Sequence, residues 1–393
     1  MVLTPYPPLR TVYTKFFSII ETNRGANKGL RLGKRHMMEQ RMTLPIRDGH
    51  AQSLAPKRSP WRSCASKTLT VVEKTAPFAI IGGLLAAALL VHPKATGLNL
   101  PEVLISPRDR FYGGAAVDAA SLWVVGGDGK ILRSDDNGAT WALQKSGVIR
   151  DLQDIVAWNG RQAVAVGDGG TLLTTADGGD TWDTVSLQAE GYRPSKLLRV
   201  TAFGDGRAVA VGEFQTILLT SDYGKTWRLG MPQRDVTLYG VSVTGGRDIW
   251  VAGELGILIH STDGGQTFAE MPKPSELTLN AIAFDDADTG IVAGLKGLLL
   301  LTTDGGKTWV PQESRTSEHF FDVMWHDHRW LAAGDKGVFV GGAATGATEW
   351  HAPGALDSFW HSKLFTRDGG KDVYACGGDI GVISDNAWHE FKS

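Results

Sequence analysis

An eight-residue motif recurs along the chain at nearly constant spacing, and this recurrence constrains the fold more than any other feature. Its frame is Ser/Thr-x-Asp-x-Gly-x-Thr-Trp/Phe, and five copies fit it: Ser134–Trp141, Thr175–Trp182, Thr220–Trp227, Ser261–Phe268 and Thr302–Trp309. The terminal aromatic residues are separated by 41, 45, 41 and 41 residues. Two degraded copies, Thr345–Trp350 and Ser384–Trp388, continue the series. The chain therefore contains seven repeated units.

Each unit divides into four apolar runs of strand length, separated by turns rich in Gly, Asp and Asn. The run Ile291–Gly294 before a Gly turn is typical, and similar runs precede the other motifs. No run has the 3.6-residue period of a helix, so the units are built from strands. Seven units of four strands predict an all-β fold, a seven-bladed β-propeller of four-stranded antiparallel blades. We place this domain at residues 108–393.

The recurring motif has a structural explanation. Its Asp accepts hydrogen bonds from backbone N–H groups of the turn, its Gly supplies a positive φ, and its Thr side chain bridges the turn. The aromatic residue begins the outer strand and packs against the neighbouring sheet. A catalytic acid would be needed once, whereas this Asp recurs in five units, so we assign a structural role to Asp136, Asp177, Asp222, Asp263 and Asp304, and to Trp141, Trp182, Trp227, Phe268 and Trp309.

Charge divides the chain into two parts that face different surroundings. Residues 1–75 hold 14 Lys/Arg against 4 Asp/Glu, whereas the remainder holds 26 against 38. We interpret 1–75 as a disordered basic region; an Arg-rich targeting peptide and sequence upstream of a later start codon are the alternatives. An acidic body lacks the clustered Lys/Arg that nucleic acid requires, so no nucleic-acid partner is expected.

One long apolar run, residues 76–91, separates the two parts, and we assign 76–94 as a membrane segment. Its 16 residues are short for a spanning helix, which needs about 20, and long for a signal-peptide core. An uncleaved transmembrane anchor, a cleaved export signal and a buried helix therefore stay open. Basic residues before the run favour retention of residues 1–75 in the cytoplasm. The propeller is then expected in the periplasm, either exported or anchored to the inner membrane.

Candidate binding residues lie near the centre of the predicted ring. Aligning the first strand of each unit on its late apolar residue places one set at an equivalent position at the channel mouth: Gly113, Asp154, Arg199, Tyr239, Asn280, Phe321 and His361. The 45-residue interval holds an extended loop, 188–196, beside Arg199. We predict that Tyr192, Arg193, Lys196 and Arg199 form a partner-contact patch, with further contacts from Asp154, Tyr239, Asn280 and His361.

Other motifs carry less chemistry. His326 and His328 flank an aspartate where an inner hairpin turns, but no further metal ligands are evident nearby, so no metal site is predicted. The Gly-rich stretches 126–129 and 167–170 resemble phosphate loops, yet no helix follows them, and we interpret both as turns between strands. No cofactor is predicted.

The motif resembles the Asp-box, or bacterial neuraminidase repeat, of sialidase-type propellers. The longer unit, such as Leu279–Trp309, is more specifically similar to the photosystem II stability/assembly factor family and its relatives in non-photosynthetic bacteria, over about residues 108–393. The resemblance implies a propeller in the periplasm or the thylakoid lumen that binds a membrane protein or its assembly intermediate. The long basic N-terminal region departs from that family. Because a fold hosts many functions, a role in photosynthesis rests on analogy.

The alternative is an Asp-box glycoside hydrolase of the sialidase type. That chemistry, as the resemblance implies, needs an arginine trio, a Tyr nucleophile with a Glu partner, and an Arg-Ile-Pro element. The propeller contains no Arg-Ile-Pro, and of its five tyrosines Tyr223 lies inside a box and Tyr374 inside a strand. A pair of carboxylates across a cleft would still suffice for glycoside hydrolysis. We therefore predict a monomeric, non-enzymatic propeller that binds protein, with glycoside hydrolysis as the alternative.

Overall fold

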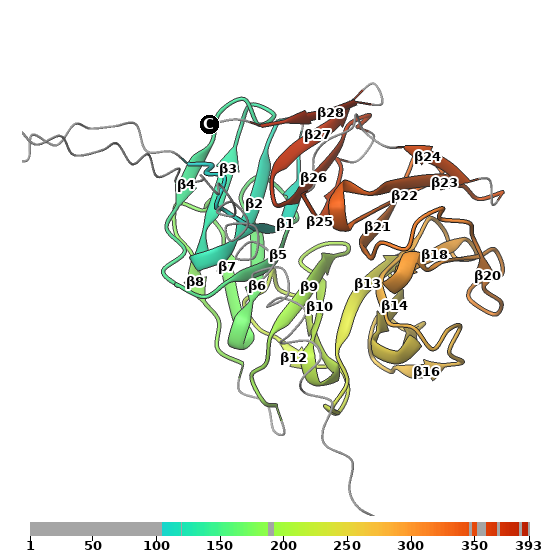
Figure 1. Ribbon diagram of the computed structural model, residues 1–393. Helices are drawn as coiled ribbons and strands as arrows, with labels where there is room; N and C mark the ends of the chain where they lie inside the picture. The colour runs from blue at the N-terminus through green and yellow to red at the C-terminus, as the bar shows by residue number, and fades with distance from the viewer. Residues whose placement is uncertain are drawn as a thin grey trace, which may run out of the picture. The chain divides into compact units, whose positions relative to one another are not determined.

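The computed structural model describes a propeller domain (Figure 1). The described residues are 104–118, 120–187, 192–345, 348–351, 359–367, 370–384 and 387–391. The predicted basic region 1–75 and the apolar segment 76–94 lie outside them. Among the described residues, no helix has the length and apolar character needed to span a membrane. The described residues belong to one compact unit, which contains all the strands given below.

Seven four-stranded antiparallel sheets form the domain, so the predicted blade number and composition are confirmed. Blade 1 contains β1 (Phe111–Ala116), β2 (Leu122–Gly126), β3 (Ile131–Ser134) and β4 (Ala142–Gln144); blade 2 contains β5 (Leu152–Ala157), β6 (Ala163–Gly167), β7 (Thr171–Thr175) and β8 (Asp183–Thr184); blade 3 contains β9 (Leu197–Ala202), β10 (Ala208–Gly212), β11 (Thr216–Thr220) and β12 (Arg228–Leu229).

The other four blades repeat this order. Blade 4 contains β13 (Leu238–Thr244), β14 (Asp248–Gly253), β15 (Leu258–Ser261) and β16 (Ala269–Met271); blade 5 contains β17 (Leu279–Phe284), β18 (Gly290–Gly294), β19 (Leu299–Thr302) and β20 (Val310–Pro311). Blade 6 contains β21 (Phe320–His326), β22 (Arg329–Gly334), β23 (Phe339–Ala343) and β24 (Thr348–His351); blade 7 contains β25 (His361–Phe365), β26 (Val373–Gly377), β27 (Ile380–Ser384) and β28 (Ala387–Glu390).

The ring closes by packing between blades and not by strand exchange. Every sheet consists of four consecutive strands, and the first strands lie nearest the centre (Figure 1). Each first strand contacts the first strand of the next blade, and β25 of blade 7 contacts β1 of blade 1. Across that seam the Ser362 hydroxyl donates to the carbonyl of Tyr112 over 3.1 Å. The first and last blades are therefore joined through side chains and packing.

The hydrophobic core consists of layers between adjacent blades. Side chains on successive strand residues point to opposite sheet faces, so each blade contributes to the layer on either side of it. The largest fully buried side chains include Trp123, Trp250 and Trp330 in the second strands of blades 1, 4 and 6. Trp250 stacks on Phe284 of blade 5 with ring centroids 5.0 Å apart. These layers hold the first strands in register around the centre.

The antiparallel order gives the ring two faces with different loops. We call one the connection face, because it carries the connections between blades and the turns between second and third strands. In six blades these turns are 3-10 turns: η1 (Gly127–Gly129), η2 (Asp168–Gly170), η3 (Glu213–Gln215), η4 (Glu254–Gly256), η5 (Leu295–Gly297) and η6 (Asp335–Gly337). The glycine-rich stretches at 126–129 and 167–170 are therefore turns between strands, as predicted. The opposite face, the box face, carries the recurring Asp motifs.

Residues just before the predicted domain start also belong to the propeller. Leu104 and Ile105 pack against the apolar cluster between blades 7 and 1. Lys130 donates to the Leu104 carbonyl over 3.0 Å and pairs with Asp109 at 2.6 Å. The described part of the domain thus begins ahead of residue 108, because these contacts fasten the entering chain to blade 1.

Candidate partner-binding site

The Asp boxes form closed hydrogen-bonded turns on the box face. In the first box, the Asp136 carboxylate accepts bonds from the Thr140 N–H at 2.8 Å and the Thr140 hydroxyl at 2.6 Å. Ser134 donates its hydroxyl to Asp136 and accepts the Gly138 N–H, both at 2.8 Å. The same set of contacts recurs around Asp177, Asp222, Asp263 and Asp304. The first residue of the box therefore has a bonding role that sequence reasoning missed.

These contacts keep the box carboxylates ionised. The Thr181 hydroxyl, with the N–H of the same residue, lowers the pKa of Asp177 to about 2. The equivalent Thr308 hydroxyl lowers the pKa of Asp304 to about 2. A general acid needs a pKa near the working pH. A carboxyl group with a pKa of about 2 is ionised at neutral pH and has no proton to donate. The geometry of the boxes is that of turn stabilisation.

Each box aromatic residue packs toward the preceding blade. Trp182 of blade 2 belongs to the cluster between blades 1 and 2, and its Nε1 donates to Gln144 of β4 over 3.1 Å. Trp141 of blade 1 lies 5.9 Å from the Phe391 ring, which follows β28 of blade 7. Trp227, Phe268 and Trp309 pack in the same way in the next clusters. The boxes therefore join neighbouring sheets.

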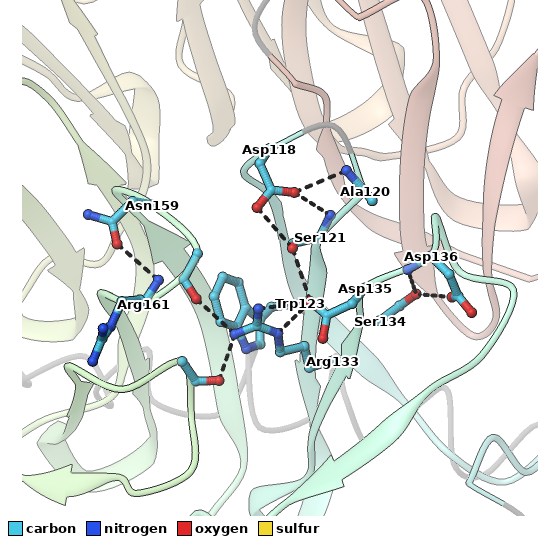
Figure 2. A network of polar contacts seen from close by, with 12 residues as sticks. Asp118, Ala120, Ser121, Trp123, Arg133, Ser134, Asp135, Asp136, Asn159 and Arg161 are labelled. Atoms are coloured by element: carbon cyan, nitrogen blue, oxygen red, sulfur yellow. Dashed lines mark hydrogen bonds and ion pairs between the residues drawn. The ribbon is translucent and has the colours of Figure 1, made fainter.

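Arg133 provides a second link between blades 1 and 2 (Figure 2). Its Nη1 donates to the carbonyls of Gly160 at 2.9 Å and Gly178 at 2.7 Å, both in blade 2. Its guanidinium lies 4.4 Å from the centroid of the Trp123 ring. Gly178 belongs to the second Asp box, so the carbonyl side of a box binds an arginine from the neighbouring sheet. This polar network is occupied by contacts within the fold.

The first strands share an irregularity in their pairing, which marks the residues that are equivalent from blade to blade. In every blade the pairing with the second strand skips one residue, so that Leu152 pairs with Gly167 and Asp154 with Val166 while Gln153 is bulged. The residue after the bulge is Gly113, Asp154, Arg199, Gly240, Ala281, Asp322 or Lys363 in blades 1 to 7. The predicted equivalence is therefore wrong, because Tyr239, Asn280 and Phe321 are bulged residues and His361 precedes its bulge.

Four charged side chains occupy the centre of the ring at the position after the bulge. Lys363 of blade 7 lies 3.0 Å from the Asp154 carboxylate of blade 2, and Asp154 is fully buried. Arg199 of blade 3 reaches across to Asp322 of blade 6 at 3.6 Å and donates to the Ser362 carbonyl of blade 7 at 3.2 Å. These residues form a buried central network, and they do not line a solvated channel.

The backbone helps to hold this central network in place. The Asp154 oxygen that pairs with Lys363 also accepts the N–H of Val200 in blade 3 at 3.0 Å, and Asp322 accepts the N–H of Leu364 in blade 7 at 2.7 Å. Gly113 provides the room, because a Cβ at this position would lie 2.4 Å from the Asp154 Cα. Sequence reasoning missed Asp322 and Lys363 because its alignment was shifted by one residue in blades 4 to 6 and by two in blade 7, and so placed Phe321 and His361 there instead.

His361 occupies a core position that is apolar in the other blades. It pairs with Gly377 where Leu or Phe pairs with Gly elsewhere, and it is 1% exposed. Its Nε2 lies 2.9 Å from Asp379, and its ring lies between those of Phe339 and Trp388. Burial of this kind removes His361 from any surface contact, so its predicted place at a channel mouth is wrong.

Two further predicted residues point to partners within the propeller. Tyr239 donates its hydroxyl to Glu254 of the same blade over 3.2 Å. The Asn280 side chain donates to the carbonyl of Phe320 in blade 6 over 2.7 Å and is buried. Asn280 therefore links adjacent first strands, and Tyr239 is half-buried near η4 on the connection face.

The extended loop before β9 brings three of the four predicted patch residues together on the connection face. Tyr192 packs against the cluster of blades 2 and 3, and Lys196 pairs with Asp168 of η2 at 3.0 Å. Arg193 is exposed, and its N–H and carbonyl bond to the Gln233 side chain at 2.8 and 3.2 Å. Arg199 is separate from this group, because its guanidinium lies in the central network. The role of these residues in binding a partner stays a prediction.

His326 ends β21 and His328 lies in the turn that follows it. His328 is exposed and lies 2.8 Å from Asp285 of blade 5, which raises the pKa of its imidazole through a hydrogen bond and charge. Asp327 and His328 both have positive φ, as expected where the inner hairpin turns. Within the described ranges no group of three or more His, Cys, Asp or Glu side chains is arranged to hold a metal ion.

Comparison with known proteins identifies a family that part of this chain resembles. A family model described as photosynthesis system II assembly factor YCF48 matches residues 205–278, which include most of blades 3 and 4. The predicted resemblance to that family is thereby confirmed. The photosystem II assembly factor family thus provides the comparison for these two blades. A search of curated proteins gave no match.

Solved structures of this family share the fold. YCF48 bound to D1 peptide superposes with a TM-score of 0.58 at 16% sequence identity, covering 68% of this chain and 90% of that chain. YCF48 from Cyanidioschyzon merolae gives a TM-score of 0.58 at 18% identity, covering 74% and 98%. At these identities the likeness establishes the propeller architecture that the repeats predicted.

Proposed function

We propose that the propeller is a non-enzymatic scaffold that binds a protein partner, in the manner of the photosystem II assembly factors. The observation that supports this proposal is that all five box carboxylates are hydrogen-bonded within their own turns. Each is bound by the Thr of its own turn, and they are distributed one to a blade around the ring. The recurring acids therefore form no pair that could cleave a glycosidic bond, which requires two carboxyl groups a few ångströms apart.

The partner is a membrane protein or its assembly intermediate. A YCF48 structure with the same fold holds a D1 peptide, which supports peptide recognition by such a propeller. The surface best suited to this task is the connection face, where the loop with Tyr192, Arg193 and Lys196 projects. The box face is less suited, because its carboxylates and Arg133 are occupied by contacts within the fold.

The propeller works outside the cytoplasmic membrane, held there by residues 76–94 or exported by them. The support is the charge division of the chain, with a basic region before the apolar run and an acidic body after it. Proteolysis of intact and permeabilised cells tests this placement. Protection of the propeller in spheroplasts would contradict it.

Affinity purification of the full chain from its native membranes, followed by mass spectrometry, tests the proposed function. We expect a membrane protein or an incomplete membrane complex to be captured. Asp222→Ala and Asp263→Ala should lower the melting temperature and leave that capture intact, since the boxes serve the fold. Turnover of a fluorogenic sialoside or glucoside by the full chain would overturn the proposal in favour of glycoside hydrolysis.

A further inference from the structure

The 3-10 turns of the connection face share a position with a strained backbone, and in two blades this position holds a large apolar residue. The middle residue of each turn has a left-handed backbone, with φ between 52° and 65°. Blades 1, 2, 5 and 6 place Asp128, Gly169, Lys296 and Lys336 there. Blades 3 and 4 place Phe214 and Leu255 there. Bulky apolar residues are disfavoured in this conformation, which Gly, Asn and Asp tolerate best.

The turn of blade 3 departs further from the pattern. Its next residue, Gln215, also has a positive φ, at a place where the other five turns have glycine. In blade 4 the glycine is obligatory, because a Cβ on Gly256 would lie 1.6 Å from the Ser275 carbonyl. In blade 3 the Gln215 side chain fits, is buried, and accepts the Arg234 Nε–H over 2.8 Å. The connection from blade 3 to blade 4 is therefore built around Gln215.

That connection is hydrogen-bonded to both of the turns that carry the apolar residues. The Arg234 N–H donates to the Phe214 carbonyl at 3.1 Å, while the Glu254 N–H donates to the Thr237 carbonyl at 2.9 Å. The segment 232–237 is thus hydrogen-bonded to both η3 and η4, which follow β10 and β14 along the chain. On its other side, Gln233 holds the backbone of Arg193. We call Arg193, Phe214, Arg234 and Leu255 the blade 3–4 ridge.

Arg234 is bound within the fold by Gln215 and Glu270, whereas the apolar side chains of the ridge are partly or largely exposed. Leu255 is 57% exposed although it is apolar, and Phe214 is only half-buried. The neighbouring glutamates are turned to the backbone: Glu213 accepts the Lys196 N–H at 3.3 Å and Glu254 accepts the Thr237 N–H at 2.9 Å. Among the described residues, no carboxylate pairs with the exposed Arg193. The ridge therefore offers two apolar contacts beside a cation without a counter-ion.

We infer that the blade 3–4 ridge binds a peptide segment of the partner through two apolar side chains and one acidic side chain. The apolar side chains pack on Phe214 and Leu255, and the acidic side chain pairs with Arg193. This inference rests on the proposed function and specifies its binding surface. Residues held in disfavoured backbone conformations are concentrated at binding sites, and Phe214 and Leu255 are held in such a conformation.

Selection from a random dodecapeptide phage library on the immobilised full chain tests the ridge. We expect enriched peptides to carry two apolar residues near an Asp or Glu. Phe214→Gly with Leu255→Gly should weaken binding of those peptides at least about tenfold, the size expected for central contacts. The same double variant should keep or raise the melting temperature, because glycine relieves the left-handed strain. A merely structural role would instead lower the melting temperature.

Matched variants separate the ridge from general effects of the turns. Lys296→Gly with Lys336→Gly relieves the same strain in blades 5 and 6 and should leave peptide binding unchanged. Arg193→Glu should weaken binding of acidic peptides, whereas Arg150→Glu, an exposed arginine between blades 1 and 2, should not.

Three results would overturn the inference. These are failure to enrich peptides, equal binding by the Phe214→Gly and Leu255→Gly double variant, and dimerisation of the full chain that this variant abolishes. If membrane-protein capture persists in the double variant, the proposed function stands and the ridge assignment fails. If wild-type protein captures nothing, the proposed function itself fails.

Discussion

Replacing Lys363 with Met tests whether the central network holds the ring together. Methionine keeps most of the aliphatic stem and removes the charge, so the main change is loss of the ammonium group 3.0 Å from Asp154. The Asp154 carboxylate is fully buried, and it keeps the Val200 N–H as a bonding partner. The substitution therefore leaves a buried negative charge without its nearest counter-ion.

The size of the effect follows from burial. Removing one partner of a buried ion pair costs about 3–5 kcal/mol, because the remaining charge cannot be hydrated. Arg199 also interacts with Asp154, so the carboxylate keeps one positive charge nearby after the substitution. The free energy of unfolding should therefore fall by about 3 kcal/mol for Lys363→Met, near the lower limit. Adding Asp154→Asn removes the stranded charge while keeping an acceptor for Val200. The double variant should then be more stable than Lys363→Met alone.

Urea unfolding followed by tryptophan fluorescence measures both effects. Lys336→Met is the matched control, because Lys336 pairs with Glu318 at 2.9 Å on the surface, where an ion pair adds little stability. A loss for Lys363→Met no greater than that of the control would refute the reasoning. Strict additivity of Lys363→Met and Asp154→Asn would refute it as well, since it would show that the two charges do not interact.

Three further predictions concern the boxes and the layers between blades. The pKa of Asp177 is about 2 in the fold and about 4 in an unfolded chain, so the stability it contributes is present above about pH 4 and lost as pH falls through about 2; Asp177→Asn should differ from wild type in urea midpoint at pH 7 and converge with it toward pH 2. Arg133→Met should cost about 2 kcal/mol through loss of its bonds to blade 2, measured by urea unfolding, and a change below about 0.5 kcal/mol would contradict this. Trp250→Ala should cost about 4 kcal/mol by cavity formation, and an unchanged melting temperature would show that its layer does not support the ring.

The blade number and the hydrogen bonding of the boxes could be predicted because the same motif recurs in the sequence at nearly constant spacing. Five copies of one turn with Asp and Gly at fixed places define the motif, and their spacing defines the unit. The structure shows those contacts, as between Asp136 and Thr140. The role of Ser134 was missed because Ser and Thr are common in turns for several reasons.

The repeat spacing defines the equivalent positions at the centre of the ring, because the residues after the bulge, from Gly113 to Asp322, are separated by 41, 45, 41, 41 and 41 residues, as the boxes are. One extra residue in each first strand reverses which side chains share a sheet face. The alignment slipped by one residue in blades 4 to 6, and it therefore mixed residues after the bulge, such as Asp154, with bulged residues, such as Tyr239. The pairing of Lys363 with Asp154 joins blades 7 and 2, and the repeat does not determine which of the equivalent positions pair across the centre.

The consecutive order of strands within every blade means that the chain could begin at any gap between blades. Leu104 and Phe391 pack in the same apolar cluster, so a short linker would connect the natural ends of the domain. Opening the chain instead between Ile149 and Arg150, which are exposed in the connection between blades 1 and 2, would divide no sheet. A circularly permuted domain made in this way would keep all seven sheets. In a propeller whose last blade combines strands from both ends of the chain, joining the ends and opening the chain elsewhere would change how that blade is assembled.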